Sequence, residues 1–211
     1  MIPNRQTVLA NIAGIITGGS TANINKNAQG ARLTLYLQTR AHRNQHPSVA
    51  SFLASGTCIQ SIYDTMDSWG MNSRGAQMED YPAFMANLQA NIGGFTNVEV
   101  AATSFSWTNR AAVIQSLSSL YDSLALMKTS GRLVSNAKCL HCVFPDLCPP
   151  ADRIHTLQKL YGHTGESKGK FVEVLELAYD VIGGIQNPQQ YFDSQWNTCE
   201  TKLVDNAIWL M

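Results

Sequence analysis

The sequence predicts an all-α protein, folded as a single compact domain of about eight to ten helices. Apolar residues recur at helical spacing along most of the 211 residues, whereas alternating strand patterns are almost absent. Glycines and prolines interrupt the chain at the intervals expected between helices. We therefore expect one unit over residues 1–211, which would divide, if at all, into helical lobes of about 1–128 and 129–211.

Each helix is expected where an apolar stripe lies between two such interruptions. Pro47 opens a long helix, in which Gly56 marks either close packing or a break. Gly93 and Gly94 are expected to close another helix. The expected helices span residues 2–16, 31–43, 47–66, 82–92, 109–128, 133–144, 152–162, 171–182 and 188–210.

The composition narrows the class of protein. Fifteen basic and fifteen acidic residues give no net charge, which argues against a general nucleic-acid coat but allows a local phosphate-binding patch. No segment reaches the length of a membrane span, and the N-terminus lacks the basic region of a signal peptide. We expect a cytoplasmic protein without a membrane partner, and the sequence does not indicate its oligomeric state.

The main candidate for a functional segment is residues 133–162, which read LVSNAKCLHCVFPDLCPPADRIHTLQKLYG. An apolar helical run is followed by a loop containing Pro149 and Pro150 and by a second helix that opens at Asp152. Asp152 and Arg153 are therefore expected at a helix N-terminus, where a carboxylate is favoured. The simplest interpretation is that Asp152 only caps this helix.

A lysine on one helix, a proline-rich loop and an aspartate opening the next helix resemble the core of the helix-hairpin-helix DNA glycosylases. The resemblance covers about thirty residues, and only Gly131 is present where the family hairpin normally carries two glycines. It implies that Asp152 is the catalytic carboxylate, which stabilises positive charge on the sugar or activates water. It also implies that Lys138 holds a phosphate or attacks the sugar of a flipped nucleotide.

The resemblance further implies a reaction and a substrate. The expected enzyme is a monofunctional DNA N-glycosylase, which flips a modified nucleotide out of the double helix and cuts the bond between base and sugar to leave an abasic site. Lys138 would be the nucleophile only if the enzyme also has lyase activity. A compact helical protein of this kind is similar to the anti-phage glycosylases that remove glucosylated hydroxymethylcytosine from viral DNA. Double-stranded, modified DNA is thus the expected partner, and no cofactor or metal is expected.

A turn over residues 68–76, SWGMNSRGA, supplies the second candidate site element. Trp69 could stack on a base, Asn72 could bond a base edge, and Arg74 could hold a phosphate or a sugar hydroxyl. The alternative is that Trp69 belongs to the core and Arg74 caps the preceding helix.

Two further residues are placed by helical spacing. His155 lies one turn after Asp152 and can share its face, and it is predicted, together with Arg153, to contact the DNA. Lys202 and Asp205 lie three apart on the last helix, where such a pair is usually a surface ion pair of little consequence. If the last helix packs against the segment opening at Asp152, Lys202 could instead reach a DNA phosphate.

Two other classes of function stay open. A non-enzymatic helical binding module would use Asp152 as a cap and the Trp69 turn as a protein contact. A metal-dependent nuclease would need clustered carboxylates, for which Asp146 and Asp152 are the candidates. The Cys139-x-x-Cys142 pair lacks a second pair at similar spacing, so buried free thiols are expected there rather than a metal site.

Overall fold

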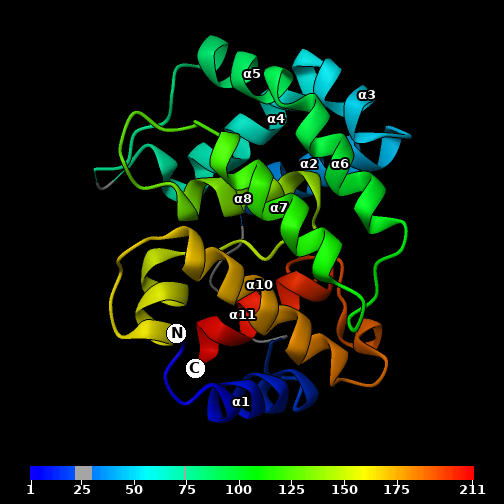
Figure 1. Ribbon diagram of the computed structural model, residues 1–211, viewed down its shortest axis with the longest axis vertical. Helices are drawn as coiled ribbons and strands as arrows, with labels where there is room; N and C mark the ends of the chain where they lie inside the picture. The colour runs from blue at the N-terminus through cyan, green and yellow to red at the C-terminus, as the bar shows by residue number, and fades with distance from the viewer. Residues whose placement is uncertain (22–29, 74) are drawn as a thin grey trace.

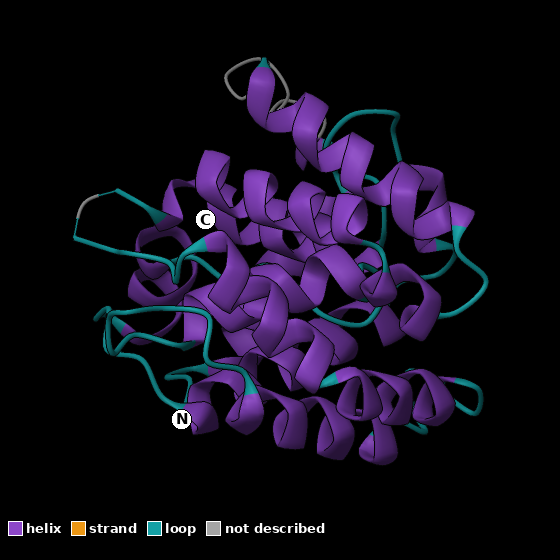
Figure 2. Ribbon diagram, turned by 90° about the horizontal axis from the view of Figure 1, so that it is seen from above, coloured by secondary structure: helices purple, strands orange, loops and turns teal. Residues whose placement is uncertain are grey.

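The computed structural model describes residues 1–21, 30–73 and 75–211. Within these ranges every regular element is a helix, and the one sheet-type contact is an isolated bridge between Met78 and Met127. Figure 2 shows helices stacked throughout the molecule and linked by loops, several of which project from the surface. The expected all-α class is confirmed.

The α-helices vary from one turn to more than four turns in length. They are α1 (Arg5–Thr17), α2 (Ala31–Gln45), α3 (Val49–Ala54), α4 (Gly56–Met66), α5 (Tyr81–Ala90), α6 (Ile92–Ala102), α7 (Ala111–Ser123), α8 (Leu133–Val143), α9 (Lys159–Tyr161), α10 (Lys168–Gly183) and α11 (Glu200–Leu210). Segments of other helical pitch are η2 (Asp67–Met71), η3 (Arg153–Gln158) and η4 (Pro188–Tyr191).

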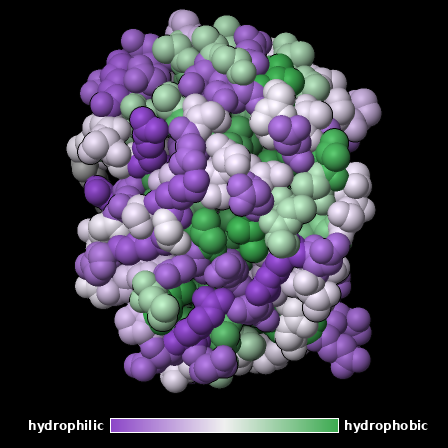
Figure 3. All heavy atoms as spheres, viewed as in Figure 1, coloured by the Kyte–Doolittle hydropathy of each residue, from purple (hydrophilic) through white to green (hydrophobic). Residues whose placement is uncertain are grey.

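Helix α8 lies across the middle of the fold. In Figure 1, α2 to α6 lie above it, while α1, α10 and α11 lie below it near the two chain ends. Helix α8 contacts α2 and α4 on one side and α10 on the other, and each of its eleven residues is buried. One continuous core of apolar side chains extends from Ile2 to Ile208. The face drawn in Figure 3 is largely polar, with apolar atoms gathered near its centre.

The expected helix end at Gly93 and Gly94 is wrong. Helix α5 ends at Ala90, and α6 starts at Ile92 and continues through both glycines. A Cβ atom added to Gly94 would lie 3.0 Å from Leu120 Cδ1, so the missing side chain lets α6 and α7 pack closely. Glycine marks a close approach of two helices here rather than a helix terminus.

Two of the expected helices are each divided into two. The helix over 47–66 breaks at Ser55, whose hydroxyl accepts a hydrogen bond from the first turn of α4 and caps it. The helix over 188–210 becomes the single turn η4, a loop and α11. The Asp193 carboxylate accepts a hydrogen bond from the backbone N–H of Asn197 and stabilises the turn before α11.

Substitution of Gly94 by valine tests the close packing of α6 on α7. We expect Gly94→Val to lower the free energy of unfolding by about 1–3 kcal/mol more than Gly93→Val, because a side chain at Gly94 meets Leu120. Gly93 is the matched control, since it lies in the same turn and a Cβ there has no neighbour within 4 Å. Urea unfolding of both variants measures the difference, and equal stabilities would contradict the packing argument.

Candidate functional site

Lys138 is a buried amine at the centre of the fold. It lies on α8 and is only 7% exposed, and its Nζ donates a hydrogen bond of 3.0 Å to the backbone carbonyl of Trp69. The same Nζ lies 3.8 Å from Asp152 Oδ2. Burial lowers the pKa of Lys138, although the carboxylates of Asp152 and Asp205 oppose this effect. Its amine is therefore neutral more often than that of a surface lysine.

Asp152 uses its two carboxylate oxygens differently. Oδ1 accepts hydrogen bonds from the backbone N–H groups of Ile154 and His155, at 2.9 and 3.1 Å, and so caps η3. Oδ2 faces Lys138. Burial raises the pKa of this carboxyl, but the Lys138 ammonium and the two backbone donors outweigh burial, and the net shift is downward. The predicted cap is confirmed, and it leaves one oxygen beside the lysine.

A second ion pair lies next to the first. Helix α11 packs against η3 and carries Lys202, whose Nζ donates a hydrogen bond of 2.5 Å to Asp205 Oδ2. Both side chains are 9% exposed, so this is a buried pair rather than a surface one. Burial raises the pKa of Asp205, and the nearby Asp152 carboxylate adds to that rise. Lys202 is thus held inside the protein, away from the surface position that a phosphate contact needs.

Aromatic rings surround the Lys202 amine. Its Nζ lies 5.8 Å from the ring centroid of Trp69 and 5.4 Å from that of Trp196, at cation–π distance. The Tyr36 ring packs against both tryptophans, with centroid distances of 5.3 and 6.0 Å. The Tyr36 hydroxyl is within hydrogen-bonding distance, 2.9 Å, of His141 Nε2. Trp69 therefore belongs to the site, between the two amines.

Tyr36 and Trp196 are site residues that the sequence analysis did not identify. They lie on α2 and in the loop before α11, and their rings are stacked with an interplanar angle of 6°. No spacing in the sequence relates two residues so far apart, so the folded chain alone reveals this contact.

The predicted residues Arg153 and His155 lie at the outer edge of the cluster. Arg153 Nε pairs with a carboxylate oxygen of Glu166 at 3.0 Å, and the other oxygen of Glu166 accepts a hydrogen bond of 2.7 Å from Leu133 N at the start of α8. His155 stacks on Trp209 with ring centroids 3.7 Å apart, and Trp209 is 45% exposed. Arg153 thus ties η3 to α8, while His155 and Trp209 form an aromatic rim.

Asn72 lies outside the cluster and has a local structural role. Its side-chain carbonyl accepts a hydrogen bond of 2.8 Å from Met78 N, and its amide donates to Asp67 Oδ1. These bonds close the turn that follows η2. Arg74 lies outside the described residues.

The cysteines are free and buried, as the sequence analysis expected. In the described part of the chain, no group of three or more His, Cys, Asp or Glu side chains is arranged to hold a metal ion. Asp146 lines a separate surface groove together with Phe105, Trp107 and Glu200. Asp152, the other carboxylate considered for a nuclease, is not among the residues that line this groove.

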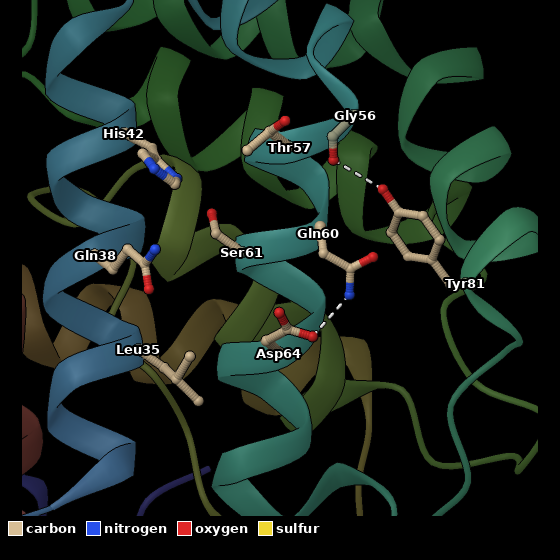
Figure 4. Close-up of a pocket in the computed structure, with 9 residues that line it drawn as sticks. All are labelled: Leu35, Gln38, His42, Gly56, Thr57, Gln60, Ser61, Asp64 and Tyr81. Carbon is tan, nitrogen blue, oxygen red and sulfur yellow. Dashed lines mark hydrogen bonds between the residues drawn. The ribbon is translucent and has the colours of Figure 1, made fainter.

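Two surface grooves occur away from the charged cluster. One of about 370 Å³ lies between α2 and α4 near Tyr81, and Figure 4 shows Gln38, Gln60 and Asp64 among the side chains that line it. The other, of about 530 Å³, is the groove beside Asp146. Lys138 and Lys202 line neither groove. The candidate site is a packed cluster of charges and aromatic rings, in which the Asp152 side chain is 36% exposed to solvent.

Compared with models of protein families, with curated proteins and with solved structures, the chain gives no match. Among the described residues, no helix is both long and apolar enough to cross a membrane. The site therefore has to be interpreted from its own chemistry.

Neutralising Asp152 tests the interaction with Lys138. Because the folded-state pKa of Asp152 is lowered, its charge stabilises the fold above the ordinary value of 3.8, and this stabilisation is lost as the pH falls through the folded value. At about pH 7 we expect the wild type to have a larger free energy of unfolding than Asp152→Asn, which keeps a capping side chain. The difference should shrink toward about pH 3.

Urea unfolding at both pH values measures this difference. Asp122→Asn is the control, because Asp122 forms an exposed pair with Lys168 and should change stability little at either pH. A gap between wild type and Asp152→Asn that is the same at both pH values would contradict a stabilising attraction between Asp152 and Lys138.

Proposed function

We propose that this protein is a DNA N-glycosylase that removes a modified base, with Lys138 and Asp152 as its catalytic residues. The observation that carries the proposal is the buried Lys138 amine, held 3.8 Å from a carboxylate oxygen that the helix cap does not use. The resemblance of residues 133–162 to the helix-hairpin-helix DNA glycosylases supports the same assignment, since these two residues occupy the matching positions.

Asp152 supplies the charge that the reaction requires. As the bond between base and sugar breaks, positive charge develops on the sugar, and a fixed carboxylate stabilises it more in the transition state than in the ground state. Oδ1 is fixed by two backbone donors, so Oδ2 is held in one direction and loses little freedom during the reaction. An unionised carboxyl would lose this effect, and the lowered pKa keeps Asp152 charged.

Lys138 suits nucleophilic attack better than a grip on phosphate. An amine that is 7% exposed and bonded to a backbone carbonyl does not reach a surface phosphate, whereas a flipped nucleotide would reach it by displacing side chains of the packed cluster. Attack requires the neutral amine, which the lowered pKa favours. The nitrogen lone pair of Lys138 forms a bond to C1′ of the sugar, the electron pair of the C1′–N bond leaves with the base, and the amine proton passes to Asp152 or solvent.

The aromatic residues supply surfaces for an extruded base. Trp69 borders both amines, and Trp209, which is stacked on His155, is 45% exposed. Flipping costs a few kcal/mol, which stacking on such rings partly offsets. We propose glucosylated hydroxymethylcytosine in viral DNA as the substrate, and this choice is supported by the resemblance to anti-phage glycosylases.

The test has two levels, the reaction and the substrate. An oligonucleotide with an abasic site, incubated with borohydride, traps an amine bound to C1′ and needs no particular base. We expect wild-type protein to give a covalent adduct that Lys138→Gln abolishes. Lys168→Gln, which removes an exposed lysine paired with Asp122, is the matched control and should trap normally. Absence of the adduct in the wild type would contradict lysine attack.

Intact duplexes then test the base. Duplexes carrying glucosylated hydroxymethylcytosine, hydroxymethylcytosine or cytosine are incubated with protein and treated with alkali. We expect breaks only in the glucosylated duplex, with the rate lowered by about 10²–10³-fold in Asp152→Asn. A trapped adduct without breaks in any of the three duplexes would retain the glycosylase class and exclude the named base. Breaks without alkali that depend on added metal would indicate a nuclease instead.

A further inference from the structure

The two buried lysines meet at one residue, Trp69. Its backbone carbonyl accepts the hydrogen bond from Lys138, and the face of its ring lies against the Lys202 amine. Lys202 Nζ also donates a hydrogen bond of 2.5 Å to Asp205 and lies 5.4 Å from the ring centroid of Trp196. Any displacement of Lys202 therefore disturbs the residue that positions Lys138.

A buried ion pair loses the hydration free energy of both charges, a cost that a surface pair largely avoids. The presence of the Lys202–Asp205 pair therefore needs an explanation. Lys202 and Asp205 lie within a run of eight consecutive buried residues of α11, from Thr201 to Ile208. Apolar residues in their place would pack α11 at least as well. The electrostatic effect of Lys202 and Asp205 on the neighbouring charged groups explains the presence of the pair better than packing does.

The charged groups around Lys138 come from three elements. Two carboxylates favour the protonated amine, Asp152 at the N-cap of η3 and Asp205 on α11. Two cations disfavour it, Lys202 on α11 and Arg32 on α2. On α8 itself the thiol of Cys142 is close enough to interact with the amine. The Lys202–Asp205 pair thus places one charge of each sign within reach of Lys138.

We propose that Lys202 and Asp205 are positioning residues, which fix Trp69 and, through it and through their opposite charges, set how often the Lys138 amine is neutral. This inference rests on the proposed function, because Lys138 must be the attacking amine for its protonation to matter. Neither Lys202 nor Asp205 needs to touch the sugar.

If this role is correct, substitution of Lys202 and substitution of Asp205 shift the pKa of Lys138 in opposite directions. In Lys202→Met a like charge disappears, so the pKa of Lys138 rises and its rate of attack at a fixed acidic pH falls severalfold. In Asp205→Asn an opposite charge disappears, so the pKa falls and the same rate is retained to lower pH. The double variant should return toward the wild type. A merely structural pair would instead lower activity in both variants without moving the pH profile.

Titration of Lys138 without DNA tests the inference directly. The folded protein is methylated with formaldehyde and cyanoborohydride between about pH 6 and pH 10, and the peptide containing Lys138 is quantified by mass spectrometry. The exposed Lys168 serves as the reference in each sample. We expect the half-reaction pH of Lys138 to move up in Lys202→Met and down in Asp205→Asn. Shifts that are absent, or in the same direction, overturn the proposal.

Lys202→Arg keeps the charge and guards against a folding artefact. It should leave the half-reaction pH of Lys138 near that of the wild type, and a large shift in this variant also overturns the proposal. The trapping reaction on abasic DNA, repeated across the same pH range, separates the two hypotheses. If the half-reaction pH of methylation shifts in opposite directions but the wild type gives no trapped adduct, the proposed function alone is overturned. If the wild type is trapped but the pH profile of trapping is unchanged in both single variants, the positioning role alone is overturned.

Discussion

Burial of the Lys138 amine is the constraint on which the centre of this fold depends. An ammonium group that is 7% exposed needs acceptors at once, because an unpaired buried charge costs several kcal/mol. The Trp69 carbonyl and the Asp152 carboxylate provide them. Segments η2 and η3, far apart in the chain, are thereby required to meet at α8. The contact of the Lys202 amine with the Trp69 ring joins α11 to the same cluster.

Capping and catalysis are compatible roles for Asp152. A carboxylate has two oxygens and about four acceptor positions, so one oxygen can satisfy the first turn of η3 while the other faces Lys138. The cap also fixes the direction in which the free oxygen points. In this arrangement the local function of Asp152 provides the rigidity that its proposed chemical function needs.

Local sequence predicted the features whose causes are local. Two prolines and an aspartate sufficed to place the start of η3 at Asp152, and apolar spacing sufficed for the all-α class. The role of Gly94 was missed because its reason is Leu120, on another helix. The contact of Trp69 with Lys202 and the stacking of Tyr36 on Trp196 join distant segments, so no spacing in the sequence contains them. Asn72 had the right chemistry for base recognition but uses it to close its own turn.

The lowered pKa of Lys138 has two consequences for the proposed reaction. When Lys138 is protonated, its positive charge offsets the negative charge of Asp152. The carboxylate then gives little electrostatic stabilisation to a positively charged sugar. Loss of the proton creates the nucleophile and, in the same step, exposes the negative charge of Asp152 to the reacting sugar. Because Lys202 and Asp205 form their own neutral pair, they do not cancel that charge. A single proton on Lys138 would thus control both catalytic groups.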